Sequence, residues 1–366
     1  MALQVGIVGL PNVGKSTLFN ALTAAKAEAA NYPFCTIDPN VGVVTVPDDR
    51  LKKISELIKP KSLVPTTIEF VDIAGLVAGA SKGEGLGNQF LGHIRQTDAI
   101  VHVVRCFDDP NIVHVSGSVD PVRDIAVINT ELMLADFDTV DKRVQKVEKV
   151  AKTGTDKKLK AEYDAIKKVY DALAQGCPAR SVKLDEAEAP FVRDLHLLTS
   201  KPVLYACNVN EADMQAGGNP WVNEVIRFAE GENNRYVVIC SALEAEIAQL
   251  PKEEQADFLA SIGAKEPGLS RLIFEAYKLL ELWTYFTAGE KEVRAWTIRR
   301  GYKAPQAAGV IHSDFEKGFI RAETYSCNDL FTLKNEQAVK DAGKYRVEGK
   351  EYLVQDGDIL FFRFNV

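Results

Sequence analysis

The residues best suited to chemistry lie near the N-terminus, in Gly9-Leu10-Pro11-Asn12-Val13-Gly14-Lys15-Ser16-Thr17. This segment matches G-x-x-x-x-G-K-S, a loop whose backbone amides surround phosphates while the lysine reaches the β and γ oxygens and the serine binds Mg²⁺. An apolar run at residues 4–8 precedes it, and apolar residues at helical spacing follow it. The pattern predicts a strand, a phosphate loop and a helix. The predicted nucleotide-binding residues of this loop are Asn12, Val13, Gly14, Lys15, Ser16 and Thr17, and Lys15 is also expected to be catalytic.

A second motif indicates the metal site and the γ-phosphate sensor. The apolar run 68–71 ends in Asp72-Ile73-Ala74-Gly75, a D-x-x-G sequence in which the aspartate orients Mg²⁺ through water and the glycine N–H senses the γ-phosphate. Thr36, in a loop between the two motifs, is predicted as a further Mg²⁺ ligand. Leu76 stands where Ras-like enzymes place a glutamine, so another group must position the attacking water.

The base-binding loop is predicted after the apolar run 202–207. Asn208-Val209-Asn210-Glu211 stands where guanine-specific enzymes carry N-K-x-D, and an amide such as Asn208 can pair with N6 and N7 of adenine. This register, with Val209 and Glu211, favours ATP over GTP. A second register from Asn210 to Asp213 also fits N-x-x-D and would favour GTP, so both remain open.

Ser241-Ala242 follows the last strand-like run, at residues 236–240, and is predicted to pack on the base.

Composition limits the class of protein. The chain has 366 residues, 46% of them hydrophobic and 26% charged, which indicates a globular protein of two or more domains. Its six cysteines form no C-x-x-C pair, so neither a zinc site nor a disulfide framework is expected. We find no apolar run of about 18 residues and no secretory signal pattern. We therefore expect a cytoplasmic protein without a membrane partner.

Heptad spacing predicts a helical insertion. Apolar residues recur from Met133 to Ala151 and from Leu159 to Leu173, on either side of a glycine turn, as in an antiparallel coiled-coil hairpin. Residues 141–168 contain ten Lys or Arg and five Asp or Glu, a net charge of +5, although the whole chain carries -7. The remaining residues therefore carry -12. Such a hairpin suits RNA or an acidic protein, or is simply a solvated surface.

Together these patterns predict an α/β fold. A P-loop nucleotide-binding domain is expected over residues 1–128 and 201–278, interrupted by the coiled-coil insertion at 129–200. A small module of short strands and helices is expected at 279–366.

In this order, the motifs resemble those of the YchF family of OBG-like ATPases, over essentially the whole chain. Residues 9–20 and 31–40 carry the most specific part of the resemblance. It implies that the C-terminal module is a TGS domain with a β-grasp fold, and that ATP is preferred with weaker use of GTP. It also implies a catalytic histidine on a mobile loop, matched here by His114, and a K⁺ ion held beside the phosphates by Asn12. The implied partners are the large ribosomal subunit and its rRNA, bound through the coiled coil and the TGS domain.

The function expected from these patterns is a monomeric, Mg²⁺-dependent ATPase switch that binds the ribosome and modulates translation or a stress response. Lys15, His114 and Gly75 are its expected catalytic residues. Two alternatives are a GTPase of the translation-factor type and a nucleotide-gated regulator with little need for hydrolysis. A small-molecule kinase is disfavoured because we find no lid with phosphate-clamping arginines.

Overall fold

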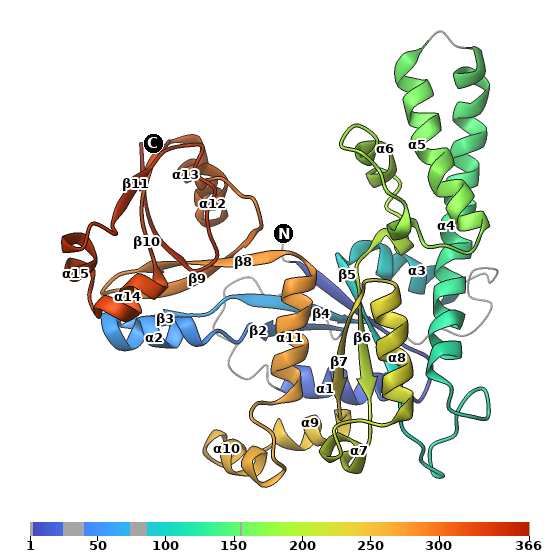
Figure 1. The fold of residues 1–366 in the computed structure, drawn as a ribbon, viewed down its shortest axis with the longest axis horizontal. Coiled ribbons are helices and arrows are strands. Elements are labelled where there is room, and N and C mark those ends of the chain that lie inside the picture. Colours follow the sequence, from blue (N-terminus) through green and yellow to red (C-terminus); the bar gives the residue numbers. More distant parts are fainter. Residues whose placement is uncertain (1–2, 25–39, 74–85, 154–155, 366) are drawn as a thin grey trace. The chain divides into compact units, whose positions relative to one another are not determined.

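The computed structural model describes residues 3–24, 40–73, 86–153 and 156–365. The chain forms two units, and each contains segments that are distant in sequence (Figure 1). Unit 1 comprises residues 1–44 and 69–276, and unit 2 comprises residues 45–68 and 277–366. Thr36, Gly75 and Leu76 lie outside the described residues. None of the described helices is both long enough and apolar enough to cross a membrane.

Unit 1 is built on a six-stranded sheet of order β2-β4-β1-β5-β6-β7. Its central pairs, β4 with β1, β1 with β5, β5 with β6 and β6 with β7, are all parallel. Every residue of β5 and β6 is buried, which is typical of central strands covered on both faces. The strands are β1 (Gln4–Val8), β2 (Val41–Thr45), β4 (Thr67–Asp72), β5 (Ala99–Arg105), β6 (Val203–Asn208) and β7 (Arg235–Ile239).

Helices connect these strands and extend beyond them. They are α1 (Lys15–Ala24), α3 (Leu86–Gln96), α4 (Pro121–Thr153), α5 (Lys157–Ala174), α6 (Ala189–Arg193), α7 (Glu211–Gln215), α8 (Pro220–Gly231), α9 (Ser241–Ile247), α10 (Lys252–Ser261) and α11 (Gly268–Leu279). Two short 3₁₀ helices lie at Ala179–Ser181 and Leu198–Ser200.

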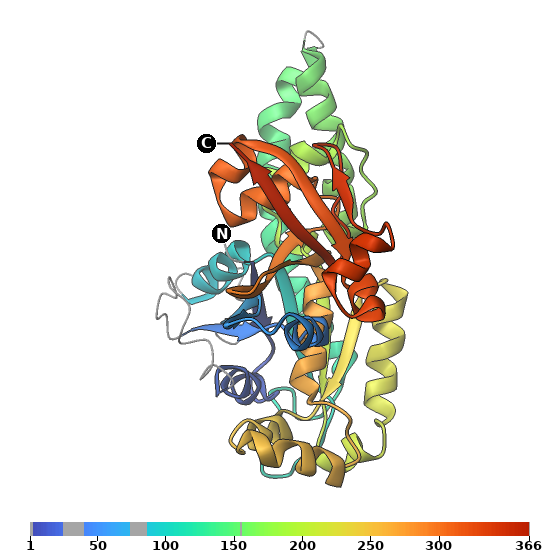
Figure 2. The same ribbon diagram turned by 90° about the vertical axis from the view of Figure 1, so that its left-hand side faces the viewer.

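Helices α4 and α5 form the predicted helical hairpin, in which they run side by side (Figures 1 and 2). Residues of the heptad pattern, including Val140, Val144 and Ile166, are buried between them. However, α4 begins at Pro121, eight residues before the predicted boundary at 129. The side chain of Asp120 accepts a hydrogen bond from the backbone N–H of Arg123 at 3.0 Å, and the following proline suits a first helical turn. The helix therefore starts within the nucleotide-binding domain.

Unit 2 contains a second six-stranded sheet, of order β11-β10-β12-β8-β9-β3. The pairs β8 with β9, β10 with β11 and β10 with β12 are antiparallel, whereas β3 with β9 and β12 with β8 are parallel. Its strands are β3 (Ser62–Val64), β8 (Leu282–Ala288), β9 (Glu292–Arg299), β10 (Phe319–Ser326), β11 (Arg346–Glu348) and β12 (Asp358–Phe364). Its helices are α2 (Asp49–Ile58), α12 (Ala304–Ile311), α13 (Ser313–Lys317), α14 (Cys327–Leu333) and α15 (Glu336–Asp341).

The segment 45–68 differs from the predicted domain boundaries, which assigned it to the nucleotide-binding domain. Helix α2 is amphipathic, and its buried residues Leu51 and Ile54 belong to the same core cluster as Phe286 and Ile359. Strand β3 extends the sheet of unit 2 by pairing with β9. Burial of the apolar face of α2 against residues more than 200 positions away therefore places this segment in the C-terminal unit.

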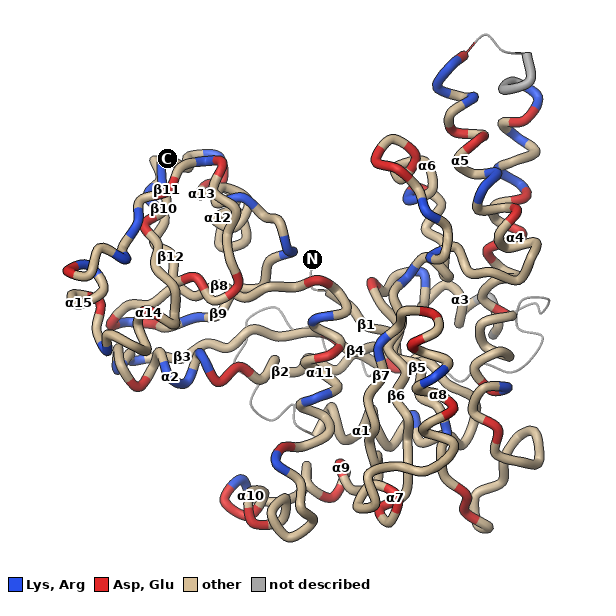
Figure 3. The backbone as a smooth tube through the Cα atoms, in the orientation of Figure 1, with Lys and Arg blue, Asp and Glu red and all other residues tan. Residues whose placement is uncertain are grey.

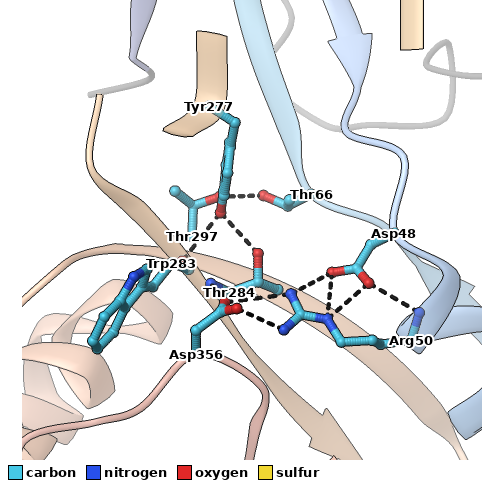
Figure 4. A network of polar contacts seen from close by, with 8 residues as sticks. All are labelled: Asp48, Arg50, Thr66, Tyr277, Trp283, Thr284, Thr297 and Asp356. Atoms are coloured by element: carbon cyan, nitrogen blue, oxygen red, sulfur yellow. Dashed lines mark hydrogen bonds and ion pairs between the residues drawn. The ribbon is translucent and has the colours of Figure 1, made fainter. Parts of the chain in front are cut away.

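A polar network also holds this segment in unit 2 (Figure 4). The guanidinium of Arg50 donates to Asp48 and, at 2.7 Å, to Oδ2 of Asp356, whose Oδ1 accepts from the backbone N–H of Thr284.

The hydroxyl of Tyr277 lies in the same network, 2.9 Å from Thr284 Oγ1 and 3.0 Å from Thr297 Oγ1. Burial raises the pKa of Tyr277 to about 12, so its phenol stays protonated. Thr66 Oγ1 lies 2.5 Å from Thr297 Oγ1 and completes the link to segment 45–68.

We expect Ile54→Ala to destabilise unit 2 by about 2 to 5 kcal/mol, because Ile54 is fully buried and its truncation leaves a cavity. Urea unfolding followed by fluorescence measures this in variants that keep only Trp221 (unit 1) or only Trp283 and Trp296 (unit 2). Ile100→Ala, in β5, is the matched control and should destabilise unit 1 instead. An equal loss in both units for Ile54→Ala would contradict the assignment of α2.

Candidate nucleotide-binding site

The phosphate loop joins β1 to α1 as predicted. Gly14 has a φ of 93°, and a Cβ added there would lie 2.2 Å from Nδ2 of Asn208. Both the backbone conformation and the close approach of Asn208 therefore require glycine. Asn12 also has a positive φ, 63°, which asparagine tolerates better than most residues. Helix α1 begins at Lys15, so its N-terminus faces the loop and favours bound anions.

The two predicted charged groups of the phosphate and metal sites lie together. Nζ of Lys15 forms an ion pair with Oδ1 of Asp72, at the end of β4. Ser16 and Thr17 are exposed in the first turn of α1. The oxygens of Ser16 and Asp72 are the hard ligands that Mg²⁺ prefers, so these residues fit that ion. Among the described residues, no three His, Cys, Asp or Glu side chains gather into a metal-binding cluster.

Asn208 connects the phosphate loop to the loop that follows β7. It is the last residue of β6 and is only 4% exposed. Its Nδ2 donates to the carbonyl of Val13 at 2.8 Å, and its Oδ1 accepts from the backbone N–H of Ser241 at 2.9 Å. The amide thus brings together three segments that sequence analysis had assigned separately to phosphate and base binding.

A cavity of about 480 Å³ lies at this junction. It opens at the carboxyl ends of β1, β5, β6 and β7, where parallel α/β sheets bind their ligands. Eight of its lining residues are ones that the sequence predicts to bind the nucleotide. They are Asn12, Gly14, Thr17, Asn208, Val209, Glu211, Ser241 and Ala242. The predicted base loops and the phosphate loop therefore face one cavity.

The two possible base-binding registers differ clearly in geometry. Asn210 caps α7 by accepting from the N–H of Asp213 at 2.7 Å, and Oδ2 of Asp213 accepts from Nδ2 of Asn219 at 2.8 Å. Val209 is buried at the cavity, and Glu211 is exposed in the first turn of α7. The polar groups of the second register are thus engaged by residues 213 and 219, although Asn210 lines the cavity as well.

The loop after β5 supplies the remaining wall of the cavity, through Phe107, Asp109 and Ile112. Arg105, the last residue of β5, is 1% exposed and fixes this loop through two hydrogen bonds. Its Nε donates to the carbonyl of Phe107 at 3.1 Å and its Nη2 to that of Ile112 at 3.0 Å. These residues were missed by sequence analysis, although their position directly after a buried strand was a usable signal.

His114 lies farther along the same loop but does not line the cavity in the described structure. The residue is 8% exposed, and its Nε2 lies 2.8 Å from Oδ2 of Asp124 in the first turn of α4. Its Nδ1 accepts from the backbone N–H of Ser116 at 3.0 Å. In this conformation both ring nitrogens are engaged away from Lys15, unlike the arrangement expected of a catalytic histidine.

The loop nevertheless contacts the phosphate loop directly. Nδ2 of Asn12 donates to the carbonyl of Val113 at 3.1 Å. The residue next to His114 is therefore bonded to the residue predicted to hold K⁺.

Comparison with known proteins agrees with this geometry. A family model described as 50S ribosome-binding GTPase matches residues 4–154, and a model for the YchF GTPase C-terminal domain, described as a protein of unknown function, matches 282–365. The chain is 59% identical over 367 residues to the ribosome-binding ATPase YchF of Bacillus subtilis, and the match covers 100% of both chains. This chain belongs to the YchF family.

Other members of the YchF family show the same full-length agreement. The ribosome-binding ATPase YchF of Escherichia coli O157:H7 is 57% identical over 366 residues, again covering 100% of both chains. The structure of the Schizosaccharomyces pombe YchF GTPase matches 99% of this chain and 97% of its own with a TM-score of 0.89 and 42% identity. The expected α/β P-loop fold and the family resemblance are therefore confirmed.

We expect Asn208→Ala to weaken ATP binding by about tenfold or more, because the phosphate loop and the loop after β7 would lose the amide that joins them, and ATP would have to order them on binding. Isothermal titration calorimetry with ATP and Mg²⁺ measures the change. Asn210→Ala is the comparison variant and should weaken binding less than threefold, since its side chain caps α7. A larger effect at Asn210 would support the second register.

Proposed function

We propose that this member of the YchF family is an ATP-hydrolysing switch that binds the ribosome. The observation that carries the proposal is the cavity where the phosphate loop, Asn208 and Ser241 meet, with the Lys15–Asp72 pair directly after the loop residue Gly14. Such a site binds a nucleoside triphosphate with its phosphates at the N-terminus of α1 and its base near Asn208.

Each residue of the site has its own proposed role in hydrolysis. Lys15 and the loop amides bind the phosphate oxygens and stabilise the charge that develops on them. Ser16 and Asp72, with Thr36, would hold Mg²⁺, which neutralises phosphate charge when bound. Gly75 would sense the γ-phosphate, and Asn12 would hold a K⁺ ion through its amide oxygen. His114 would orient the attacking water after leaving Asp124, since Leu76 has no group that can do so.

ATP is the proposed substrate because of the residue at position 209, since Asn208 and Asn210 both line the cavity and do not separate the two registers. A lysine would stand at Val209 in a guanine-specific loop, and here the side chain is apolar and buried. The curated relatives carry the name ATPase, which agrees with this choice. GTP is the second candidate because the Schizosaccharomyces pombe relative is titled a GTPase.

The ribosome is the proposed partner, and the helical hairpin is the proposed contact. Relatives are named ribosome-binding, and one matching family model is described as 50S ribosome-binding. Lys and Arg are frequent along α4 and α5 (Figure 3), and those that are exposed suit rRNA phosphates. Among the described side chains, the exposed lysines are Lys142, Lys146, Lys149, Lys157, Lys158, Lys160 and Lys168.

We propose further that the hairpin is a coiled coil and that the C-terminal unit is a TGS domain of the β-grasp type, which would offer a second contact. The large subunit is the proposed target, so the protein would act in the cytoplasm, as a monomer.

We expect His114→Ala to lower ATP turnover at least about a hundredfold while leaving ATP affinity within about twofold, since a positioned acid or base contributes about 10²- to 10⁴-fold. Phosphate release is measured with ATP and with GTP, in K⁺ and Mg²⁺, with and without ribosomes. Turnover at the wild-type rate would refute the role of His114. Tenfold tighter binding of GTP than of ATP would refute the base assignment.

We expect the double variant Lys146→Ala with Lys149→Ala to bind ribosomes more weakly, and the slope of log affinity against log salt to fall by roughly 1.5, as expected for two lost phosphate contacts. Cosedimentation at several salt concentrations measures both quantities. Arg227→Ala with Lys265→Ala removes two exposed charges of unit 1 outside the hairpin and should change neither. Equal losses in both double variants would exclude the hairpin as the contact.

A further inference from the structure

The bonds of His114 determine which of its nitrogens carries the proton. The backbone N–H of Ser116 can only donate, so Nδ1 of His114, 3.0 Å away, must be unprotonated. The ring proton therefore lies on Nε2 and is donated to Oδ2 of Asp124 at 2.8 Å. With 8% of His114 and 2% of Asp124 exposed, this hydrogen bond to a carboxylate is shielded from water. Neither nitrogen is then free to accept a proton from water.

In the loop around His114, apolar side chains are exposed and a polar side chain is buried. Val113 and Val115 are 75% and 53% exposed, whereas the histidine between them is buried. Buried polar and exposed apolar side chains are the informative exceptions to ordinary packing. Exposure thus alternates along residues 113–115, which run into a turn where the N–H of Gly117 donates to the carbonyl of His114 at 3.0 Å. A rearrangement of this turn that exchanged the two faces of residues 113–115 would bury the valines and expose His114 together.

Asp124 is able to release His114 without becoming isolated. Its Oδ1 lies 3.3 Å from Nη2 of Arg123, and it occupies the first turn of α4, where the helix dipole favours a negative charge. These two interactions do not depend on His114. The bond to His114 is the contact of Asp124 that would be lost if the loop rearranged.

From these observations we propose that Asp124 is a positioning residue that holds His114 in a buried, inactive conformation, the idle state. Hydrolysis then requires the loop to rearrange so that His114 is exposed and Val113 and Val115 are buried. The proposal rests on the proposed role of His114 in hydrolysis. It assigns a function to a carboxylate that lies outside the nucleotide cavity.

The test uses Asp124→Asn in the full chain. The variant keeps the shape of the side chain but replaces a charge-assisted hydrogen bond with a weaker neutral one. We expect kcat for ATP without ribosomes to rise about tenfold with KM unchanged, because Asp124 does not line the cavity. In ¹⁵N NMR, the wild-type His114 ring should show the Nε2–H tautomer alone, and the variant should show a second population in which the ring has left Ser116 and position 124. Backbone amides of residues 107–118 should exchange faster with solvent.

Two further variants keep the result interpretable. Asp138→Asn makes the same chemical change at an exposed position of α4 and should alter none of these quantities. Val113→Ser with Val115→Ser changes exposed side chains, so the resting fold is preserved. It removes the apolar side chains that would be buried once the loop has rearranged. Its kcat should fall about fivefold.

The outcomes separate this proposal from the proposed function. A lower or unchanged kcat for Asp124→Asn, with His114→Ala inactive, would overturn the idle state alone. Wild-type turnover by His114→Ala would overturn both. In the double variant Asp124→Asn with His114→Ala, turnover should be as low as in His114→Ala, because the gain acts through the histidine.

Discussion

The nucleotide site depends on one side-chain amide. Asn208 joins the carbonyl of Val13, 195 positions earlier, to the N–H of Ser241, 33 positions later. Both partners are backbone groups, so the amide positions the loops whatever side chains they carry. This explains how Val209 can replace a lysine without loss of the loop geometry. The amide also packs so closely against Gly14 that a Cβ at that position would not fit. This close contact holds the phosphate loop at the edge of the sheet, where Lys15 reaches Asp72.

The parts of the site that could be predicted are those determined by neighbouring residues. The phosphate loop, Asp72 and Asn208 each follow a buried strand directly, and the helical hairpin follows from heptad spacing. Helix α2 could not be assigned correctly because an amphipathic pattern shows that one face is buried but not what covers it. The same limit applies to His114. Its sequence position suggests an exposed loop, and only the tertiary contact with Asp124 shows that the ring is enclosed.

The charge distribution of unit 1 follows its elements rather than the chain as a whole. The helical hairpin carries an excess of lysine, while α7, α9 and α10 carry seven acidic residues against the single lysine Lys252 (Figure 3). The acidic residues are Glu211, Asp213, Glu244, Glu246, Glu253, Glu254 and Asp257. A polyanion would therefore be attracted to one part of this unit and repelled from another. Such an arrangement favours one orientation of approach, in addition to strengthening contact.

Unit 2 is formed by two segments that are distant in sequence, so its core is completed late during synthesis. Residues 45–68 leave the ribosome early, but the strands that cover Leu51 and Ile54 begin only after residue 277, about 200 residues later. At ~5–20 residues per second, α2 waits roughly 10 to 40 s with its apolar face uncovered. The chain between these segments contains most of unit 1, which can fold during that interval. The core that contains Leu51 and Ile54 is therefore completed only at the end of synthesis, although residues 45–68 are among the first to be made.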